Sequence, residues 1–369
     1  MITKETQQNQ DGKGTSNGMK LLIFTQKVDS ADDNLGFFQR WIEEFARRCE
    51  EVIVICLYEG QHSLPANVRV LSLGKEGGVS RLKYLYRFYS YIWGEQKHYD
   101  SVFVHMNQIY VILGGVLWRL LGKRIGLWYA HGTVNTMLRL AMLFVHDAFT
   151  STSQSLRIES RKRRIIGHGI DTDLFTLQTK VPTAIPFSIL SVGRISPVKD
   201  YETLIEATKI LREANISLSV KILGTTGAGR QGCYFEELLH KVEDYGLADV
   251  VHFVGASLYK DMPSQLSLAH VLVNTSGTGS LDKAPLEAMA MGIPVLTCNE
   301  GVVHALPNSL REELSFPPHD AHTLAEKLIF LSQESSEERI LRGRILRDVV
   351  VKNHALPHLA DTIIAVLSS

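Results

Sequence analysis

The stretch GTGSLDKAPLEAMAMGIPVLT, residues 277–297, decides the fold of the second half of the chain. It directly follows HVLVNTS (270–276), a short apolar run that is typical of a buried parallel strand. Its glycines predict a turn, and the small apolar residues that follow predict a helix that ends at Gly292. The order strand, turn, helix puts the turn at the carboxyl end of a strand, where open α/β sheets bind their ligands.

The turn has the chemistry of an anion site. Ser280 or Asp282 could cap the helix, and Pro285 lies in its first turn. A glycine-rich turn that opens a helix presents free backbone N–H groups and the positive end of the helix dipole, a combination that binds phosphate. Glu287 lies one turn further in, where its carboxylate could accept two hydrogen bonds from the diol of a ribose. A plain capped helix with an exposed glutamate fits the same residues, so this segment alone leaves both interpretations open.

A second element, VGRISPVKD (192–200), has a related character. A predicted strand ends at Gly193, and Arg194 and Lys199 follow it within six positions. Two cations at the carboxyl end of a strand suit a diphosphate, because arginine offers a bidentate fork and lysine a point charge. The alternative is a solvated turn with two surface cations.

Strands alternate with helices along the whole chain, which predicts doubly wound parallel sheets. The predicted strands of the first half are 20–26, 52–58, 101–105 and 124–131, and those of the second half are 188–193, 218–224, 250–255, 270–276 and 293–298. We therefore predict an α/β protein with two Rossmann-like domains that face each other across a cleft. The predicted boundaries are a polar, disordered tail at 1–18, an N-terminal domain at 19–180, a C-terminal domain at 181–352 with a linker near 175–187, and a last helix at 353–369 that packs back towards the N-terminal domain.

Composition excludes several classes of function. The formal net charge is +0, so no overall field attracts nucleic acid. The longest apolar run, at 110–118, is too short to span a bilayer, and residues 1–18 lack the apolar core of a secretory signal. The cysteines lie far apart and form no metal-ligand pair, which favours a reducing compartment: Cys49, Cys56, Cys233 and Cys298. We expect a cytoplasmic protein.

Taken together, the motifs resemble the family-4 retaining glycosyltransferases, which have the GT-B fold. The resemblance rests on GR-x4-K (193–199) and on LEAMAxGxPV (286–295), and it covers nearly the whole chain. GHGIDTDLF (167–175) is similar to the segment between the two domains of that family, with His168 in place of the usual asparagine. The segment 251–276 also has the strand-loop-helix-strand pattern of the family.

The resemblance implies a role for each matching position. Arg194 and Lys199, after Gly193, would bind the donor diphosphate and stabilise its charge as it leaves. Glu287 would bind the donor ribose, and backbone amides around Leu286 would also contact the nucleotide sugar.

Two positions in the N-terminal half complete the implied site. Gly36, in the loop after the first strand, would approach the diphosphate from the other side of the cleft. His131, at the end of a predicted strand, would lie against the transferred sugar, although a histidine satisfied at a strand end fits the same pattern.

One position departs from the family. Its members usually carry a second glutamate eight positions before the ribose-binding one, and that glutamate contacts the transferred sugar. Here the position is Gly279, and Asp282 is out of register. The departure concerns how the sugar is held and leaves the phosphate-binding parts in place.

Two further motifs have competing interpretations. The DxD at 171–173 could hold a divalent metal, but its context favours turn capping, and we expect no metal site. RLKYLYRFYSYIW (81–93) is basic and aromatic. It could lie on an anionic membrane near a lipid-linked acceptor, or it could be a core-packed helix whose basic side chains extend to solvent.

The expected function is therefore transfer of a sugar, with retention, from a nucleotide-diphosphate donor to a hydroxyl of a glycan or lipid-linked acceptor. We expect no metal and no cofactor besides the donor substrate, no nucleic-acid partner, and at most peripheral contact with the membrane. A GT-B nucleotide-sugar epimerase and a non-catalytic nucleotide-sugar-binding protein remain as alternatives, and the missing acid at Gly279 favours the second.

Overall fold

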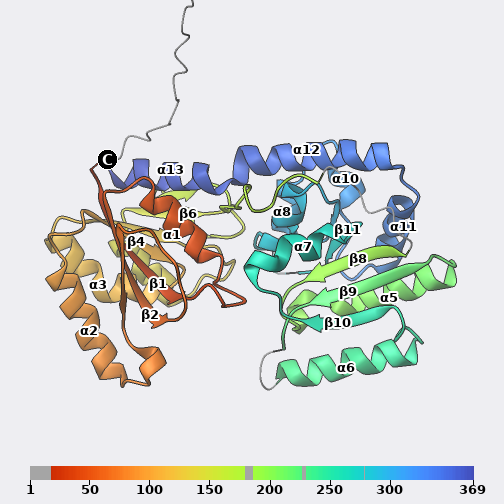
Figure 1. Ribbon diagram of the computed structural model, residues 1–369, viewed down its shortest axis with the longest axis horizontal. Helices are drawn as coiled ribbons and strands as arrows, with labels where there is room; N and C mark the ends of the chain where they lie inside the picture. The colour runs from red at the N-terminus through yellow and green to blue at the C-terminus, as the bar shows by residue number, and fades with distance from the viewer. Residues whose placement is uncertain (1–17, 179–185, 227–229, 278) are drawn as a thin grey trace, which may run out of the picture.

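The computed structural model describes residues 18–178, 186–226, 230–277 and 279–369. It contains two α/β domains side by side, each built on one parallel sheet (Figure 1). The predicted fold class, two Rossmann-like domains in the GT-B arrangement, is thereby confirmed. Most of the tail predicted at 1–18, and residues 179–185 of the predicted linker, lie outside the described residues.

The N-terminal sheet has seven strands in the order β3-β2-β1-β4-β5-β6-β7, and all its pairs are parallel. Its central strands are near-continuous apolar runs, because both faces of the sheet are covered by helices. The strands are β1 (Lys20–Val28), β2 (Glu51–Glu59), β3 (Val68–Ser72), β4 (Ser101–His105), β5 (Arg124–Trp128), β6 (Asp147–Thr150) and β7 (Arg163–Ile165).

Four helices of the N-terminal half and the last helix of the chain cover this sheet. One face packs against α2, α3 and α4 around Phe24 and Trp118, and the other packs against α1 and α13 around Trp41. These helices are α1 (Phe38–Ala46), α2 (Arg81–Gly94), α3 (Gln108–Leu120), α4 (Thr136–Phe144) and α13 (Leu356–Leu367), with a 3-10 turn η1 (Lys75–Gly77).

The C-terminal sheet has five parallel strands in the order β10-β9-β8-β11-β12. The strands are β8 (Phe187–Val192), β9 (Leu218–Leu223), β10 (Val251–Gly255), β11 (Val271–Asn274) and β12 (Val295–Thr297). The helices and 3-10 turns are η2 (Pro197–Lys199), α5 (Tyr201–Glu213), α6 (Arg230–Asp244), η3 (Tyr259–Asp261), α7 (Met262–Ser267), α8 (Lys283–Ala290), α9 (Glu300–Ala305), α10 (Arg311–Leu314), α11 (Ala321–Ser332) and α12 (Ser336–His354).

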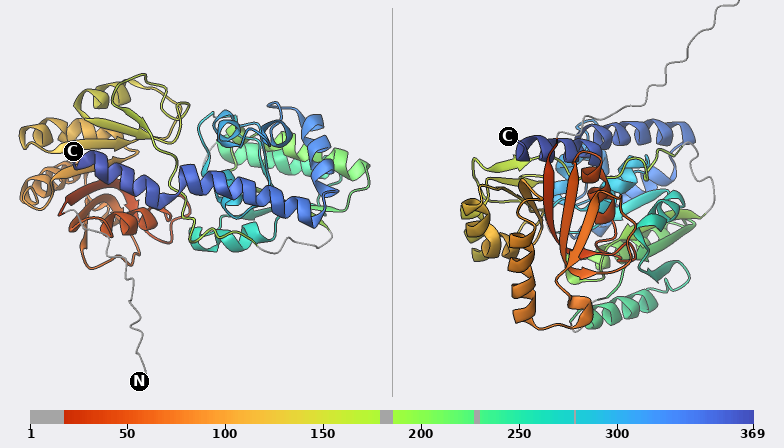
Figure 2. Two further views of the ribbon diagram at one scale, coloured as in Figure 1. Left: turned by 90° about the horizontal axis from the view of Figure 1, so that it is seen from above. Right: turned by 60° about the vertical axis from the view of Figure 1, so that its left-hand side comes forward.

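The chain crosses between the domains twice, at neighbouring places. Helices α12 and α13 run end to end along one side of both domains (Figure 2). Where they meet, Ile170 N donates to His354 O at 2.7 Å and Leu356 N donates to Ile170 O at 2.8 Å, which joins the second crossing to the first. The left-handed Gly167 lies so close to Asn353 that a Cβ there would overlap the helix backbone. The domains are therefore joined by two chain segments bonded to each other.

Some boundaries differ from those predicted. The strand predicted to reach His131 ends at Trp128, because its pairing with β6 ends there. Strands β3 and β6 were not predicted, since β3 is a half-exposed edge strand and β6 has only four residues and begins with Asp147. No helix in the described residues is both long and apolar enough to cross a membrane.

Candidate active site

The loops that follow the strands of the two sheets meet between the domains. On the C-terminal side these are the loop after β8 (193–200) and the loop after β11 (275–282). The two loops are hydrogen-bonded, because Gly277 N donates to Val198 O at 3.2 Å and Thr275 Oγ1 donates to Lys199 O at 2.5 Å. The two motifs found in the sequence thus form one surface.

Lys199 lies at the centre of this surface, and its charge is paired. Its ammonium forms a salt bridge to Asp282 Oδ2 at 2.8 Å, and the same carboxylate oxygen accepts from Asn274 Nδ2 at 2.9 Å. Asp282 occupies the N-cap position of α8, but its side chain makes no cap hydrogen bond. Of the two candidate caps, Ser280 and Asp282, Asp282 does not cap through its side chain, because its carboxylate bonds to Lys199 instead.

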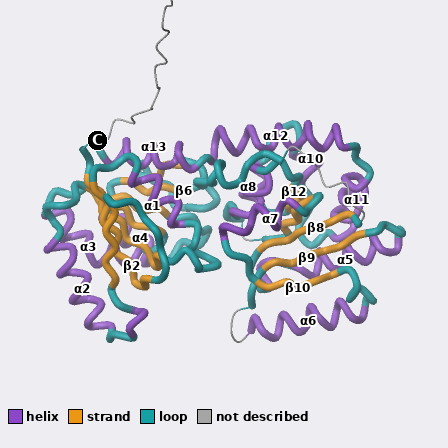
Figure 3. Tube along the Cα trace, viewed as in Figure 1, coloured by secondary structure: helices purple, strands orange, loops and turns teal. Residues whose placement is uncertain are grey.

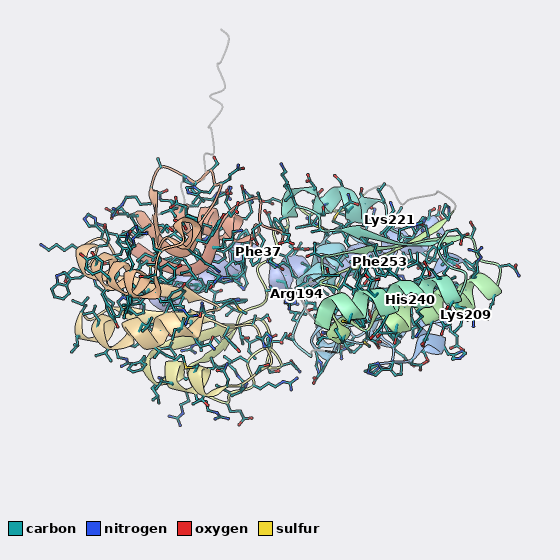
Figure 4. All side chains as sticks on the ribbon, turned by 90° about the horizontal axis from the view of Figure 1, so that it is seen from below. Phe37, Arg194, Lys209, Lys221, His240 and Phe253 are labelled. Carbon is teal, nitrogen blue, oxygen red and sulfur yellow. The ribbon has the colours of Figure 1, made fainter. Side chains whose placement is uncertain are left out.

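Arg194 and Gly193 lie beside this pair. Arg194 is exposed, and no hydrogen bond or ion pair of its side chain occurs within the described part of the chain. Figure 4 places Arg194 and Phe37 on the facing edges of the two domains. At Gly193 a Cβ atom would lie 2.9 Å from Lys199 Cε, so a side chain there would push the lysine aside. The loop after β8 thus presents one free and one paired cation to the gap between the domains.

Glu287 is buried, with 4% of its surface exposed, and its Oε1 has no hydrogen-bond partner in the described residues. It lies one turn after Lys283, whose Nζ is also buried without a hydrogen bond. Burial lowers the pKa of the Lys283 ammonium and raises the pKa of the Glu287 carboxyl, and the attraction between the two opposes both shifts. The start of α8 therefore holds two ionisable groups with unused hydrogen-bonding capacity.

The N-terminal domain contacts this lysine through Phe37. Lys283 Nζ lies 2.9 Å from the centre of the Phe37 ring and 5.9 Å from that of Tyr259. Phe37 follows Gly36, where a Cβ would lie 2.5 Å from Asp32 O, so the turn of the loop itself requires glycine. A cation over an aromatic face is attracted to the ring, and this contact links α8 to the start of α1 across the gap.

Three histidines lie near the junction of the domains: His105 and His354 are buried, and His168 is half-buried. His105 stacks on Phe38 with ring centres 4.1 Å apart, while His168 Nδ1 and His354 Nδ1 have no partner in the described residues. Burial lowers the pKa of His105 and of His168 to about 3, helped by the charge of Lys283, and lowers the pKa of His354 to about 4. All three imidazoles are therefore neutral near pH 7.

Gly279 lies against an arginine of the N-terminal domain. It has a φ of 72°, and a Cβ atom there would lie 2.6 Å from Arg157 Nη2 and 3.4 Å from Glu300 Oε2. Leu281 N donates to Ser155 Oγ at 3.2 Å, a second contact between the same two loops. A side chain at position 279 would displace Arg157. The turn therefore combines a glycine with the neighbouring Arg157 guanidinium, at the position where the resemblance implies a glutamate.

The remaining predicted residues lie less centrally. His131 is exposed three residues beyond β5, and its Nδ1 accepts from Thr133 N at 3.2 Å. The Leu286 side chain is fully buried in the C-terminal core. Asp171 Oδ1 accepts from Asp173 N and Leu174 N, as expected for a capped turn, and its Oδ2 accepts from Arg40 Nε at 2.6 Å. The structure thus joins Gly193, Lys199 and the turn before Glu287, but among the described residues no contact links His131 to that group.

Lys283, Phe37 and Arg157 were not predicted from the sequence. A signal for Lys283 was present, since a lysine four residues before Glu287 in the otherwise apolar KAPLEAMA is unusual for a buried helix. Phe37 and Arg157 gave no such signal, because their contacts join residues more than a hundred positions apart.

This fold agrees with that of the known proteins that the chain resembles. Residues 182–344 match the family model of Glycosyl transferases group 1, so this family is matched by the C-terminal domain, and the chain as a whole has the GT-B fold. The residues matched by the family model include Arg194, Lys199 and Glu287.

Curated relatives are named as glycosyltransferases, and solved structures share the fold of this chain. The chain is 28% identical over 203 residues to the putative colanic acid biosynthesis glycosyltransferase WcaL of Escherichia coli, covering 53% of this chain and 48% of WcaL. It is 27% identical over 185 residues to the amylovoran biosynthesis glycosyltransferase AmsK of Erwinia amylovora, covering 48% and 44%. The match therefore spans about half the length of these relatives. The structure of HepE from Anabaena in complex with UDP superposes with a TM-score of 0.75 at 17% identity, over 95% of this chain and 100% of HepE.

Proposed function

We propose that this protein is a glycosyltransferase that moves a sugar from a nucleotide-diphosphate donor to an acceptor hydroxyl. The observation that carries the proposal is the meeting of Arg194, Lys199 and the start of α8 at one surface, within the domain that matches Glycosyl transferases group 1. Similar proteins named as biosynthetic glycosyltransferases, and a similar fold solved with UDP and UDP-glucose, support it.

The two cations would hold the donor diphosphate and stabilise the charge that develops as the nucleotide leaves. Arg194 is free to form a bidentate contact, whereas a diphosphate would compete with Asp282 for the Lys199 ammonium. The backbone N–H groups at the start of α8 would add to this positive site. We propose that this set of groups, with no metal or further cofactor, supplies the charge stabilisation.

Glu287 would bind the ribose hydroxyls of the donor. Its Oε1 is buried without a partner, so two hydroxyl donors would satisfy an acceptor that is otherwise left unpaired. Backbone amides near Gly279 and Leu286 would contact the nucleotide sugar, and Gly36 would approach it from the N-terminal domain. His131 would lie against the transferred sugar from the N-terminal side.

We further propose that transfer retains the configuration at the anomeric carbon and that the acceptor is a glycan or a lipid-linked saccharide held by the N-terminal domain. The relatives are named for the biosynthesis of colanic acid and amylovoran, which supports a saccharide acceptor. The site lies in a chain without a described membrane-spanning helix, and we expect it to act in the cytoplasm.

The proposal is tested by incubating the protein with nucleotide sugars, with and without saccharide acceptors, and following nucleotide release and product by NMR. A transferase releases nucleotide rapidly only with acceptor, and the anomeric proton of the product reports retention. An epimerase would convert the donor alone, and a non-catalytic binding protein would bind donor without turnover under any acceptor. Either of these two results would overturn the proposal.

A further inference from the structure

Helix α2 leaves a stripe of large apolar side chains facing solvent. Leu82 and Tyr86 are 80% and 73% exposed, and Leu85, Tyr89 and Trp93 continue the stripe at helical spacing. The opposite side of the helix already fills the core through Phe88 and Ile92. The stripe is therefore surplus to the packing of the domain and exposes apolar area to water.

The stripe continues over the two neighbouring helices. Tyr89 Oη donates to Leu113 O at 3.0 Å and joins α2 to α3, while Arg119 Nε donates to Phe144 O at 2.8 Å and joins α3 to α4. We call the exposed sides of these three helices the outer face. Of the seventeen large apolar residues that are exposed in the described part of the chain, ten lie on this face: Leu82, Leu85, Tyr86, Tyr89, Trp93, Val116, Leu120, Met137, Leu140 and Leu143.

The outer face is also positively charged. Helices α2, α3 and α4 contain no aspartate or glutamate, although acidic and basic residues are equally numerous in the whole chain. Four of their basic residues are exposed: Arg81, Lys83, Arg119 and Arg139. Separation of charge of this kind in a chain without net charge marks a local site for an anionic partner.

We infer that the outer face docks the protein on an anionic lipid bilayer. Helices that carry leucine, tyrosine and tryptophan beside lysine and arginine lie in the boundary between headgroups and acyl chains, where both kinds of side chain are satisfied. Anionic headgroups add attraction to each cation near the surface. A second copy of this chain suits the face poorly, because a symmetric contact would bring like charges together.

The position of the face agrees with this docking. Figures 1 and 3 place α2 and α3 at the end of the N-terminal domain that points away from the C-terminal domain. A bilayer on this side leaves the loops around Lys199 and Lys283 open to solutes. The inference does not depend on the proposed function, since vesicle binding requires neither donor nor acceptor.

The test is flotation of the full chain with phosphatidylcholine vesicles, with and without phosphatidylglycerol. We expect the wild type to float only with the vesicles that contain phosphatidylglycerol. The double variant Leu82→Glu/Tyr86→Glu should lose this binding, and Arg81→Gln/Lys83→Gln should weaken it by about fivefold per cation. A matched control is Phe330→Glu/Leu341→Glu, two similarly exposed residues on α11 and α12 of the C-terminal domain, which should bind like the wild type.

Three results would overturn the inference. The wild type could fail to prefer anionic vesicles, or the Leu82→Glu/Tyr86→Glu variant could float as well as the wild type. Sedimentation velocity could instead show a wild-type dimer that this variant converts to monomer, in which case a second copy covers the face. If the Leu82→Glu/Tyr86→Glu variant does not fold, the Arg81→Gln/Lys83→Gln variant decides the test, because both of its substitutions replace exposed residues.

Discussion

Lowering the pH from 7.5 to 5.5 should destabilise the protein through His105, His168 and His354, the three histidines at the junction of the domains. The pKa of His105 and of His168 is lowered from 6.5 to about 3, and that of His354 from 6.5 to about 4, in each case mainly by burial. Near pH 6.5 these histidines therefore bind protons in the unfolded chain but not in the folded chain. The free energy of unfolding consequently falls as the pH decreases. Each histidine should cost about 1.4 kcal/mol at pH 5.5, which gives about 4 kcal/mol for the three.

Glu287 acts in the opposite direction. Burial raises the pKa of its carboxyl, so the folded state takes up a proton before the unfolded chain does, and this stabilises the protein as the pH falls. The offset is roughly that of one histidine, and the expected net loss is about 2 to 3 kcal/mol. This is a large part of the 5–15 kcal/mol that is typical of a folded domain.

The assay is urea unfolding followed by fluorescence at both pH values, for the wild type, His354→Gln and His358→Gln. His358 is exposed on α13 and serves as the control, because its replacement should leave the pH dependence unchanged. The free energy of unfolding that is lost between pH 7.5 and 5.5 should be about 1.4 kcal/mol smaller for His354→Gln than for the wild type. If the His354→Gln variant loses as much stability as the wild type and the control, the assignment of a neutral, buried imidazole is refuted.

Two further predictions concern the candidate site. Asp282→Asn should raise the affinity for a nucleoside diphosphate by about tenfold, because it removes the carboxylate that competes for Lys199, and an unchanged or weaker affinity in calorimetry would contradict this. Lys283→Met should raise the pKa of Glu287 further, since the lysine charge now lowers it, so the pH at which nucleotide binding is half-maximal should move upward. A pH profile identical to that of the wild type would show that the two groups do not interact.

The sequence predicted the sheets well because buried parallel strands are short apolar runs between turns. It failed where that pattern is absent. Strand β3 (Val68–Ser72) is a half-exposed edge strand, and β6 (Asp147–Thr150) has only four residues and begins with a charged one, so neither forms an apolar run of the usual length. Strand β5 ends at Trp128 although apolar residues continue beyond it, because pairing with a neighbour and not composition sets its length.

The parts of the candidate site that lie within one sequence motif could be predicted. The contacts between two distant segments could not. Arg194 and Lys199 follow a strand in the same motif, and Gly292 ends α8 with a φ of 76°, as its place in the sequence indicated. The pairing of Lys199 with Asp282 joins residues 83 positions apart, and no local pattern reports it. The contact of Lys283 with Phe37 depends on how the two domains sit, which tertiary packing alone decides.

The most direct test of the account is calorimetric binding of UDP, GDP, ADP and dTDP to the wild type and to Arg194→Ala/Lys199→Ala. Lys209→Ala/Lys221→Ala is the charge-matched control, since Figure 4 places both lysines on the C-terminal domain away from its edge with the N-terminal domain. We expect one nucleotide to bind the wild type and the control, and the double variant to bind it at least about a hundredfold more weakly, because two charge-assisted contacts are lost. Equal binding by the Arg194→Ala/Lys199→Ala variant, or no binding by the wild type, would contradict the account.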